Sequence, residues 1–199
     1  MRYEKRSRQQ AIVVIVVSTL CYCLMDYRSP FRQKTWDGVL FYFAIPFVTI
    51  LLLRQNPLRW GLSIGEWKWT LGLTLAGAAG TGLLLLGAVR LSVFKSYYDL
   101  LGPQPGGLWP WIALFAIDMF VWEFFFRGFM LFGLEPAFGE MAIYVQMIPF
   151  AIAHIGKPEL ETLSSIAGGI LIGYMVRRCR SFWPAFILHT LIGLVMYTL

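Results

Sequence analysis

Charge is what this sequence has least of. Only 14% of its 199 residues are charged, whereas a soluble domain of this length carries about a quarter. The three cysteines, Cys21, Cys23 and Cys179, form neither a zinc-binding spacing nor a disulfide framework. No DNA- or RNA-binding motif is present, and the net charge of +6 fits anionic lipid head groups at least as well as nucleic acid. We therefore expect a lipid bilayer, and no nucleic acid, as a partner.

Long apolar runs take the place of charge. Hydrophobic residues make up 58% of the chain, and their runs predict an all-α, polytopic transmembrane helical bundle in a single domain, residues 1–199. A loop is expected at residues 92–107, which are rich in Gly, Pro and Tyr. About seven spans are expected, at residues 11–25, 38–53, 69–89, 109–134, 141–155, 159–176 and 182–199.

Lysine and arginine are distributed unevenly over the predicted loops. With the N-terminus inside, the cytoplasmic segments hold ten of these residues and the opposite segments hold six, Arg127 being set aside. Because cytoplasmic loops carry an excess of Lys and Arg, this distribution favours a cytoplasmic N-terminus. The basic segments at residues 1–8 and 177–180 are then both expected on the cytoplasmic side.

One stretch of the fourth predicted span breaks the apolar pattern. It carries Asp118, Glu123 and Arg127 among aromatic and aliphatic residues. Glu123 and Arg127 are four residues apart, so they share one face of a helix. An ionisable side chain at membrane depth is costly and usually has a partner and a function. The only two histidines, His154 and His189, each lie on an apolar predicted helix, so a polar site inside the bundle is expected.

These residue types suit peptide hydrolysis. The reaction needs a base that deprotonates water and a donor for the developing oxyanion. We expect Glu123 to be a tuned base, His154 to share the proton transfer, and His189 to donate to the oxyanion. The competing interpretation is that Glu123 and Arg127 are only a buried ion pair that locks two helices together.

Two other carboxylates stand near the site in the sequence. Asp118 lies four residues before Trp122, one helical turn or about 5 Å of rise away on the same face, and would need a water molecule to reach the site. Glu161 follows a helix break that ends at Pro158, where acidic residues in the first turn are also an ordinary helix start. Because this start comes just after His154, Glu161 can fold back over the site, and it is kept as a candidate catalytic residue.

A zinc site is the main cofactor alternative. Two histidines and a glutamate are residue types that bind zinc. However, no His-Glu-x-x-His pair is present, and Arg127 beside Glu123 disfavours a bound cation. We therefore expect no metal ion and no other cofactor.

The C-terminal half resembles the CAAX-protease and bacteriocin-processing family of intramembrane proteases, also called CPBP or Abi. That family carries Glu-Glu-x-x-x-Arg on one helix, Phe-x-x-x-His on the next and His-x-x-x-Asn/Asp near its end. The matching segments, within about residues 109–199, are Trp122-Glu-Phe-Phe-Phe-Arg127, Phe150-Ala-Ile-Ala-His154 and His189-Thr-Leu-Ile-Gly193.

The resemblance implies a glutamic-type intramembrane endopeptidase that cuts a membrane-associated protein or peptide near its C-terminus. Glu123 matches the second Glu of the first motif, which holds Arg127. His154 matches the histidine that helps to activate water, and His189 matches the histidine that stabilises the oxyanion. The implied location is the bacterial inner membrane.

Two positions depart from the family pattern. Trp122 stands where the family has its first Glu, which is usually given the role of activating water. Gly193 stands where the family has the Asn or Asp that helps to stabilise the oxyanion. These departures favour an alternative function, that of a catalytically inactive relative acting as a membrane binding or immunity protein.

Overall fold

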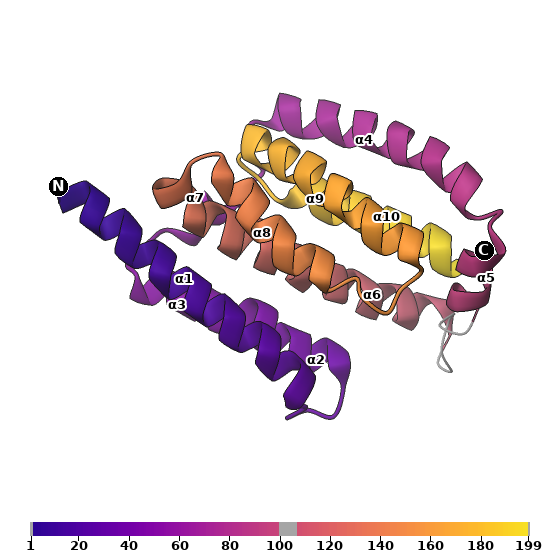
Figure 1. Cartoon of the computed structure of the whole chain (residues 1–199), viewed down its shortest axis with the longest axis horizontal. Coiled ribbons are helices and arrows are strands. Elements are labelled where there is room, and N and C mark those ends of the chain that lie inside the picture. The colour runs from indigo at the N-terminus through magenta and orange to yellow at the C-terminus, as the bar shows by residue number, and fades with distance from the viewer. Residues whose placement is uncertain (1, 100–106, 199) are drawn as a thin grey trace.

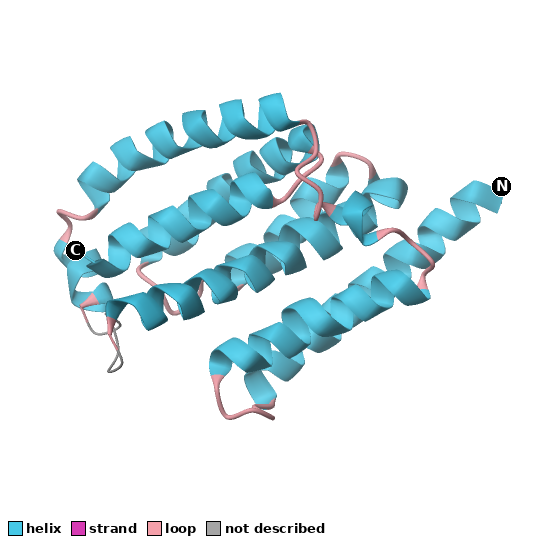
Figure 2. Ribbon diagram, turned by 180° about the vertical axis from the view of Figure 1, so that it is seen from behind, coloured by secondary structure: helices cyan, strands magenta, loops and turns pink. Residues whose placement is uncertain are grey.

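Helices account for the regular structure of the chain, as the apolar runs predict (Figures 1 and 2). The computed structural model describes residues 2–99 and 107–198 and has no β-sheet in these ranges. The predicted all-α class is confirmed. In chain order the elements are α1 (Arg2–Tyr27), α2 (Lys34–Gly38), η1 (Val39–Ala44), α3 (Ile45–Leu52), η2 (Pro57–Trp60), α4 (Trp67–Ala88), α5 (Ser92–Tyr98), α6 (Leu108–Glu123), η3 (Phe124–Phe132), α7 (Gly133–Phe138), α8 (Met141–Ile152), α9 (Glu159–Cys179) and α10 (Trp183–Thr198).

Three helices of the described chain are long and apolar enough to cross a membrane. They are Glu4–Tyr27, Lys34–Leu52 and Trp67–Ala88, and they coincide with the first three predicted spans. Met141–Ile152 and Trp183–Tyr197 are apolar but shorter. The helical bundle is confirmed, while the number of spans, about seven, stays a prediction.

The helix that carries the charged stretch is longer than predicted and changes its winding. α6, η3 and α7 follow one another without a break, and the middle segment, η3, is π-helical. A π-helix is rare, occurs mostly as a short bulge within an α-helix, and is frequent at functional sites. Two glycines let Trp60 approach this segment closely: a Cβ on Gly128 would lie 3.0 Å from the Trp60 carbonyl oxygen, and one on Gly133 would lie 2.6 Å from its ring.

This long helix lies between two groups of helices (Figure 1). α1 and α3 pack against η3 from one side, and α8 and α9 pack against it from the other. α10 packs on α6, and α4 covers α10 from outside, with Thr70 as its only buried residue. The centre is aromatic, because Phe124, Phe125, Phe126 and Phe129 are all fully buried. The bundle therefore surrounds the charged stretch with an apolar core.

The predicted loop at residues 92–107 is wrong in its first part, which forms the short helix α5. Phe94 and Tyr98 are one turn apart, and both bury their rings against Met196 of α10. This tertiary contact stabilises a helix that the polar composition of the segment does not suggest. Residues 100–106 lie outside the described part of the chain.

The position of His154 also differs from the prediction. α8 ends at Ile152, and His154 lies in the turn that follows rather than on a helix. The chain then passes through Gly156, whose φ of 97° is a left-handed value that favours glycine. Because the residue before a proline avoids helical angles, Pro158 also opposes continuation of the helix. His154 therefore lies on a tight corner between α8 and α9.

The two basic segments lie at one end of the bundle. Near the start of α1, the Gln10 side chain donates a hydrogen bond of 2.9 Å to the Gly133 carbonyl of α7. At the end of α9, Arg177 pairs with Glu135 of the same helix α7 at 2.8 Å. This arrangement fits the expectation that residues 1–8 and 177–180 share one side of the membrane. The assignment of that side to the cytoplasm stays a prediction.

Candidate active site

Glu123 is the centre of the site and is fully buried. Arg127 lies on the same face of the helix, with its Nε 3.3 Å from Glu123 Oε2 and its Nη1 3.4 Å from Oε1. His189 of α10 brings its Nδ1 to 2.7 Å from Glu123 Oε1. The structure therefore joins three of the predicted site residues through one carboxylate.

Arg127 has a second contact, with α8. Its guanidinium carbon lies 3.7 Å from the centre of the Phe150 ring, which is cation–π geometry. Arg127 is fully buried, like Glu123. The pair therefore fixes the central helix against the element that ends just before His154.

His154 is held on both sides of its corner. Its Nδ1 lies 2.8 Å from the Phe150 carbonyl oxygen, and its own carbonyl accepts a 2.7 Å hydrogen bond from the Thr162 hydroxyl of α9. Because a carbonyl only accepts, Nδ1 carries the proton, and Nε2 of the neutral ring keeps its lone pair. The His154 and His189 rings are nearly parallel, at 16°, with centres 6.2 Å apart. The fourth predicted residue is thus adjacent to the other three.

An aromatic ring lies at or beside each of the two positions at which the chain departs from the family pattern. The Trp122 ring centre lies 6.2 Å from that of His154, and its buried Nε1 has no acceptor among the described residues. A Cβ on Gly193 would lie 2.2 Å from Cζ of Phe115. The Phe115 ring therefore fills the space in which a side chain at residue 193 would begin.

Glu161 lies at the edge of this cluster. Its carboxylate accepts hydrogen bonds of 2.8 and 2.7 Å from the Tyr98 hydroxyl and pairs with Lys157 at 2.7 Å. Burial, followed by the nearby Glu161 charge, raises the pKa of the Tyr98 phenol, so this hydroxyl stays protonated and donates. In the described chain, the polar side-chain partners of Glu161 are Tyr98 and Lys157, and not the His154 ring. Its catalytic role stays a prediction.

Asp118 faces another helix. Its carboxylate accepts a 3.2 Å hydrogen bond from the Thr35 hydroxyl, which links α6 to α2. A second bond, from the Ser29 hydroxyl to Asp37, organises the nearby turn between α1 and α2. Asp118 therefore takes part in packing at this end of the bundle, one turn before Trp122 on the same helix.

Several buried polar side-chain atoms have no hydrogen-bond partner among the described residues. Native proteins leave few such atoms, and each one needs an explanation. Two of the residues that carry such atoms, Gln146 and Thr190, were not predicted from the sequence. Gln146 is one turn before Phe150 on α8 and Thr190 directly follows His189, and this spacing from the motif residues is the only sequence signal that points to them. Apart from Ser18 Oγ, the atoms of this kind in the described chain are Trp122 Nε1, Glu123 Oε2, Arg127 Nε and Nη2, Gln146 Oε1 and Thr190 Oγ1.

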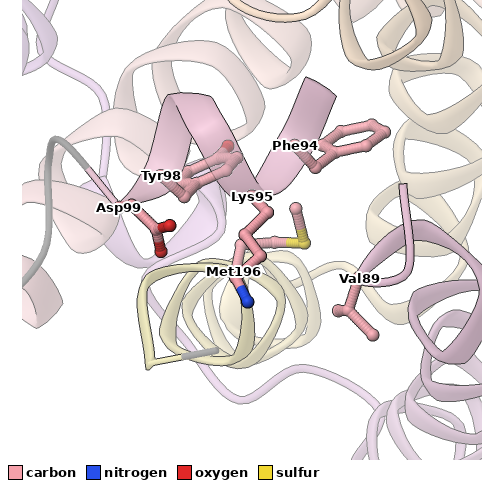
Figure 3. A pocket seen from close by; sticks show the side chains of 6 residues that line it. All are labelled: Val89, Phe94, Lys95, Tyr98, Asp99 and Met196. Carbon is pink, nitrogen blue, oxygen red and sulfur yellow. The ribbon is translucent and has the colours of Figure 1, made fainter. Parts of the chain in front are cut away.

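Two hollows lie at the ends of the bundle. One of them, between α5 and the end of α10, has a volume of about 10 Å³ (Figure 3), room for about one water molecule. A hollow of about 380 Å³ at the α7 end is lined by Glu66, Glu135, Tyr174, Arg177, Arg178 and Arg180.

A metal ion has no evident cluster of ligands in residues 2–99 and 107–198. No group of three His, Cys, Asp or Glu side chains is placed to hold one there. Glu123 is paired with the cation Arg127, which would repel a metal ion electrostatically. The expectation of a metal-free site stays a prediction.

Comparison with known proteins places the C-terminal half in a family. Residues 104–195 match the family model of the type II CAAX prenyl endopeptidase Rce1-like proteins. No curated protein and no solved structure matches the chain. The matched range includes the whole cluster, Glu123, Arg127, His154 and His189. The predicted relationship to the CPBP family is confirmed. Residues 104–195 of this integral membrane protein therefore resemble the Rce1-like CAAX proteases.

Proposed function

We propose that this chain is an intramembrane endopeptidase of glutamic type. One observation carries the proposal: a fully buried carboxylate, Glu123, is joined to Arg127 and His189, and a second histidine, His154, lies 6.2 Å from the first. Such a cluster of ionisable groups in an apolar bundle is costly. Peptide hydrolysis gives every member of the cluster a use.

His154 is the proposed base. Its Nδ1–H is committed to the Phe150 carbonyl, so its Nε2 is free to take a proton from a water molecule as that water attacks the peptide carbonyl. The same proton then goes to the leaving amine when the carbon–nitrogen bond breaks. Glu123 is less suited to the first step than the sequence suggested, because Arg127 and His189 already engage its two oxygens.

Glu123 then has two tasks. It orients His189 through Nδ1 and stabilises the protonated imidazole, as a buried aspartate does for the histidine of a serine protease. A protonated His189 can donate from Nε2 to the oxyanion that develops on the substrate carbonyl. Arg127 balances the carboxylate charge when His189 is neutral, so the buried cluster never holds an unpaired anion.

The substrate class follows from the surroundings of the site. A site enclosed by apolar helices suits a membrane-associated protein or peptide, and the family suggests cleavage near the C-terminus of such a partner. Glu161, held at the edge of the site by Tyr98, is positioned to influence substrate entry. The bacterial inner membrane, with the N-terminus in the cytoplasm, is the proposed location. Cysteine labelling that found residues 1–8 and 177–180 on opposite sides would contradict this topology.

Cleavage by the purified protein tests the function. Candidate C-terminal membrane peptides, prenylated and not, are incubated with the protein in detergent, and products are read by mass spectrometry. His154→Ala should lower cleavage by at least about a hundredfold, the contribution of a positioned general base. Glu123→Gln, which removes the carboxylate that orients His189 and stabilises its protonated ring, should also lower cleavage by at least about a hundredfold. His189→Ala should lower it as well. Glu159→Gln, an exposed carboxylate at the start of α9, is the matched control.

Glu161→Gln separates the two carboxylate candidates. If Glu161→Gln is inactive while Glu123→Gln cleaves normally, the catalytic carboxylate is the one at the start of α9. If all these variants cleave like the wild type, the proteolytic assignment is wrong.

An inactive membrane binding or immunity protein is the second candidate. Phe115 supports it, because its ring fills the space beside Gly193 where the family carries a polar side chain. In that case the wild type cleaves no peptide of the panel, and Trp122→Glu, which restores the first motif, does not reduce its binding to a membrane partner.

A further inference from the structure

The inference concerns the donor for the oxyanion, and it rests on the proposed proteolytic function. A tetrahedral intermediate places negative charge on the former carbonyl oxygen, and enzymes supply fixed hydrogen-bond donors to that position. Most N–H groups at this site are already committed. The Nδ1 atoms of both histidines are engaged, His154 with Phe150 and His189 with Glu123, and two nitrogens of Arg127 face Glu123.

Trp122 has a donor that nothing in the described chain uses. Its Nε1–H is buried and lacks an acceptor. The indole ring lies 6.2 Å from the His154 ring at an interplanar angle of 80°. An indole N–H can only donate, so it suits a carbonyl oxygen or an oxyanion and cannot serve as the base. The group beside the proposed base is therefore a donor with no other role.

The indole is also held in place, as an oxyanion donor must be. The Trp122 ring packs against Phe126 at 5.1 Å, Tyr42 at 5.9 Å and Phe150 at 6.4 Å between ring centres. These rings come from three different elements, η3, η1 and α8. Such a donor loses little entropy and needs little reorganisation when the oxyanion forms.

The other unused donors suit the task less well. The Thr190 hydroxyl rotates freely and can turn to a backbone carbonyl of its own helix. Arg127 Nη2 belongs to a guanidinium fixed between Glu123 and the Phe150 ring. Gly193 supplies no side chain, and Phe115 occupies the adjoining space.

We propose that Trp122 is a catalytic residue whose indole N–H donates to the oxyanion that forms from the substrate carbonyl oxygen. With His189 it forms a two-donor oxyanion hole. Trp122 is then a functional replacement at its position and not a disabling loss of the first glutamate.

The test compares two tryptophans. Trp122→Phe and Trp183→Phe remove the same atoms, but the Trp183 N–H donates a 3.0 Å hydrogen bond to the Leu62 carbonyl, whereas the Trp122 N–H donates to none. Trp122→Phe should lower kcat about 10²- to 10³-fold, as loss of one oxyanion donor does, with KM little changed. Trp183→Phe should keep its kcat and show the larger fall in melting temperature.

Binding of a phosphinate peptide, an uncleavable tetrahedral anion, gives a readout that needs no turnover. The wild type should bind it at least about tenfold more tightly than Trp122→Phe does, while both bind the matching amide peptide equally. If the wild type cleaves peptides and Trp122→Phe matches it in kcat and phosphinate affinity, the role of Trp122 is wrong and the protease stands. If the wild type cleaves no peptide, and its preference for the phosphinate still depends on Trp122, then Trp122 is a donor to the tetrahedral anion and the proposed proteolytic activity is wrong. If neither cleavage nor the preference is seen, both are overturned.

Discussion

Two Glu–Arg pairs in this molecule use the same chemistry in opposite surroundings. Glu123 and Arg127 are fully buried at the centre of the bundle. Glu135 and Arg180 pair at the α7 end, where their side chains are 18% and 50% exposed. Each arginine also covers a phenylalanine ring, Arg127 that of Phe150 and Arg180 that of Phe132. The two pairs differ in solvent exposure and in the second partner of the carboxylate, His189 for Glu123 and Arg177 for Glu135.

Exposure reverses what each pair contributes. A pair on the surface is solvated, and breaking it changes the free energy of unfolding by about 0–1 kcal/mol. A buried pair gains little net stability, because the loss of hydration offsets the attraction, yet removing one partner is severe. Apolar residues of similar volume would stabilise the core equally well. The buried pair is therefore better explained by chemistry than by packing.

The largest expected effect is that of Arg127→Ala. It leaves Glu123 buried and without its cation, which should lower the free energy of unfolding by roughly 3–5 kcal/mol. Thermal and denaturant unfolding in detergent would measure this loss. The double variant Glu123→Leu/Arg127→Met should recover most of the stability but none of the cleavage. Wild-type stability in Arg127→Ala would mean that Glu123 is solvated or neutral.

Gly193→Ala should have the next largest effect. The added Cβ would lie 2.2 Å from the Phe115 ring, and overpacking of this kind typically costs about 1–3 kcal/mol. Phe115→Leu should relieve the clash, so the loss in the double variant should be smaller than the sum of the two single losses. Strictly additive losses of stability in this cycle would show that the two positions are not in contact.

Tyr98→Phe addresses the exposed edge of the site. It removes the hydroxyl that donates to Glu161, and a hydrogen bond to a charged group contributes about 1.5–3 kcal/mol. We expect the lower end of that range, because Lys157 still pairs with Glu161. Cleavage should change less than in Glu123→Gln. A loss of cleavage as large as that variant's, in stably folded protein, would place Glu161 among the catalytic residues.

Much of the fold could be predicted from the sequence, because hydrophobic runs in a membrane protein mark its helices directly. The Glu123–Arg127 pair followed from a spacing of four residues. The contact of Glu123 with His189 depends on how α10 packs against α6, and no local pattern encodes that. The winding of η3 depends on its hydrogen-bond register, which a run of apolar residues does not specify.

The wrong predictions have two physical causes, tertiary contacts and local backbone chemistry. α5 forms because Phe94 and Tyr98 bury against α10, although its composition suggests a loop. His154 lies outside the helix because Gly156 and Pro158 turn the chain before the apolar run ends. The steric relation between Gly193 and Phe115 joins residues of two helices, so the sequence showed only that a family residue was missing.

The smallest expected effect is that of Arg180→Ala, which completes the comparison of the two pairs. Glu135 keeps Arg177 as a partner at 2.8 Å, so no carboxylate is left alone, and the free energy of unfolding should fall by about 0–1 kcal/mol. Arg180 ends α9 with a φ of 56°, a left-handed value that costs an L-residue roughly 1–2 kcal/mol. Glycine does not have this cost, so a substitution by glycine should lower the free energy of unfolding less than a substitution by alanine. Arg180→Gly should therefore be more stable than Arg180→Ala, and salt should reduce the difference between Arg180→Ala and the wild type. A loss in Arg180→Ala as large as that of Arg127→Ala would mean that the α7 end is buried in the membrane, and the contrast between the two pairs would not hold.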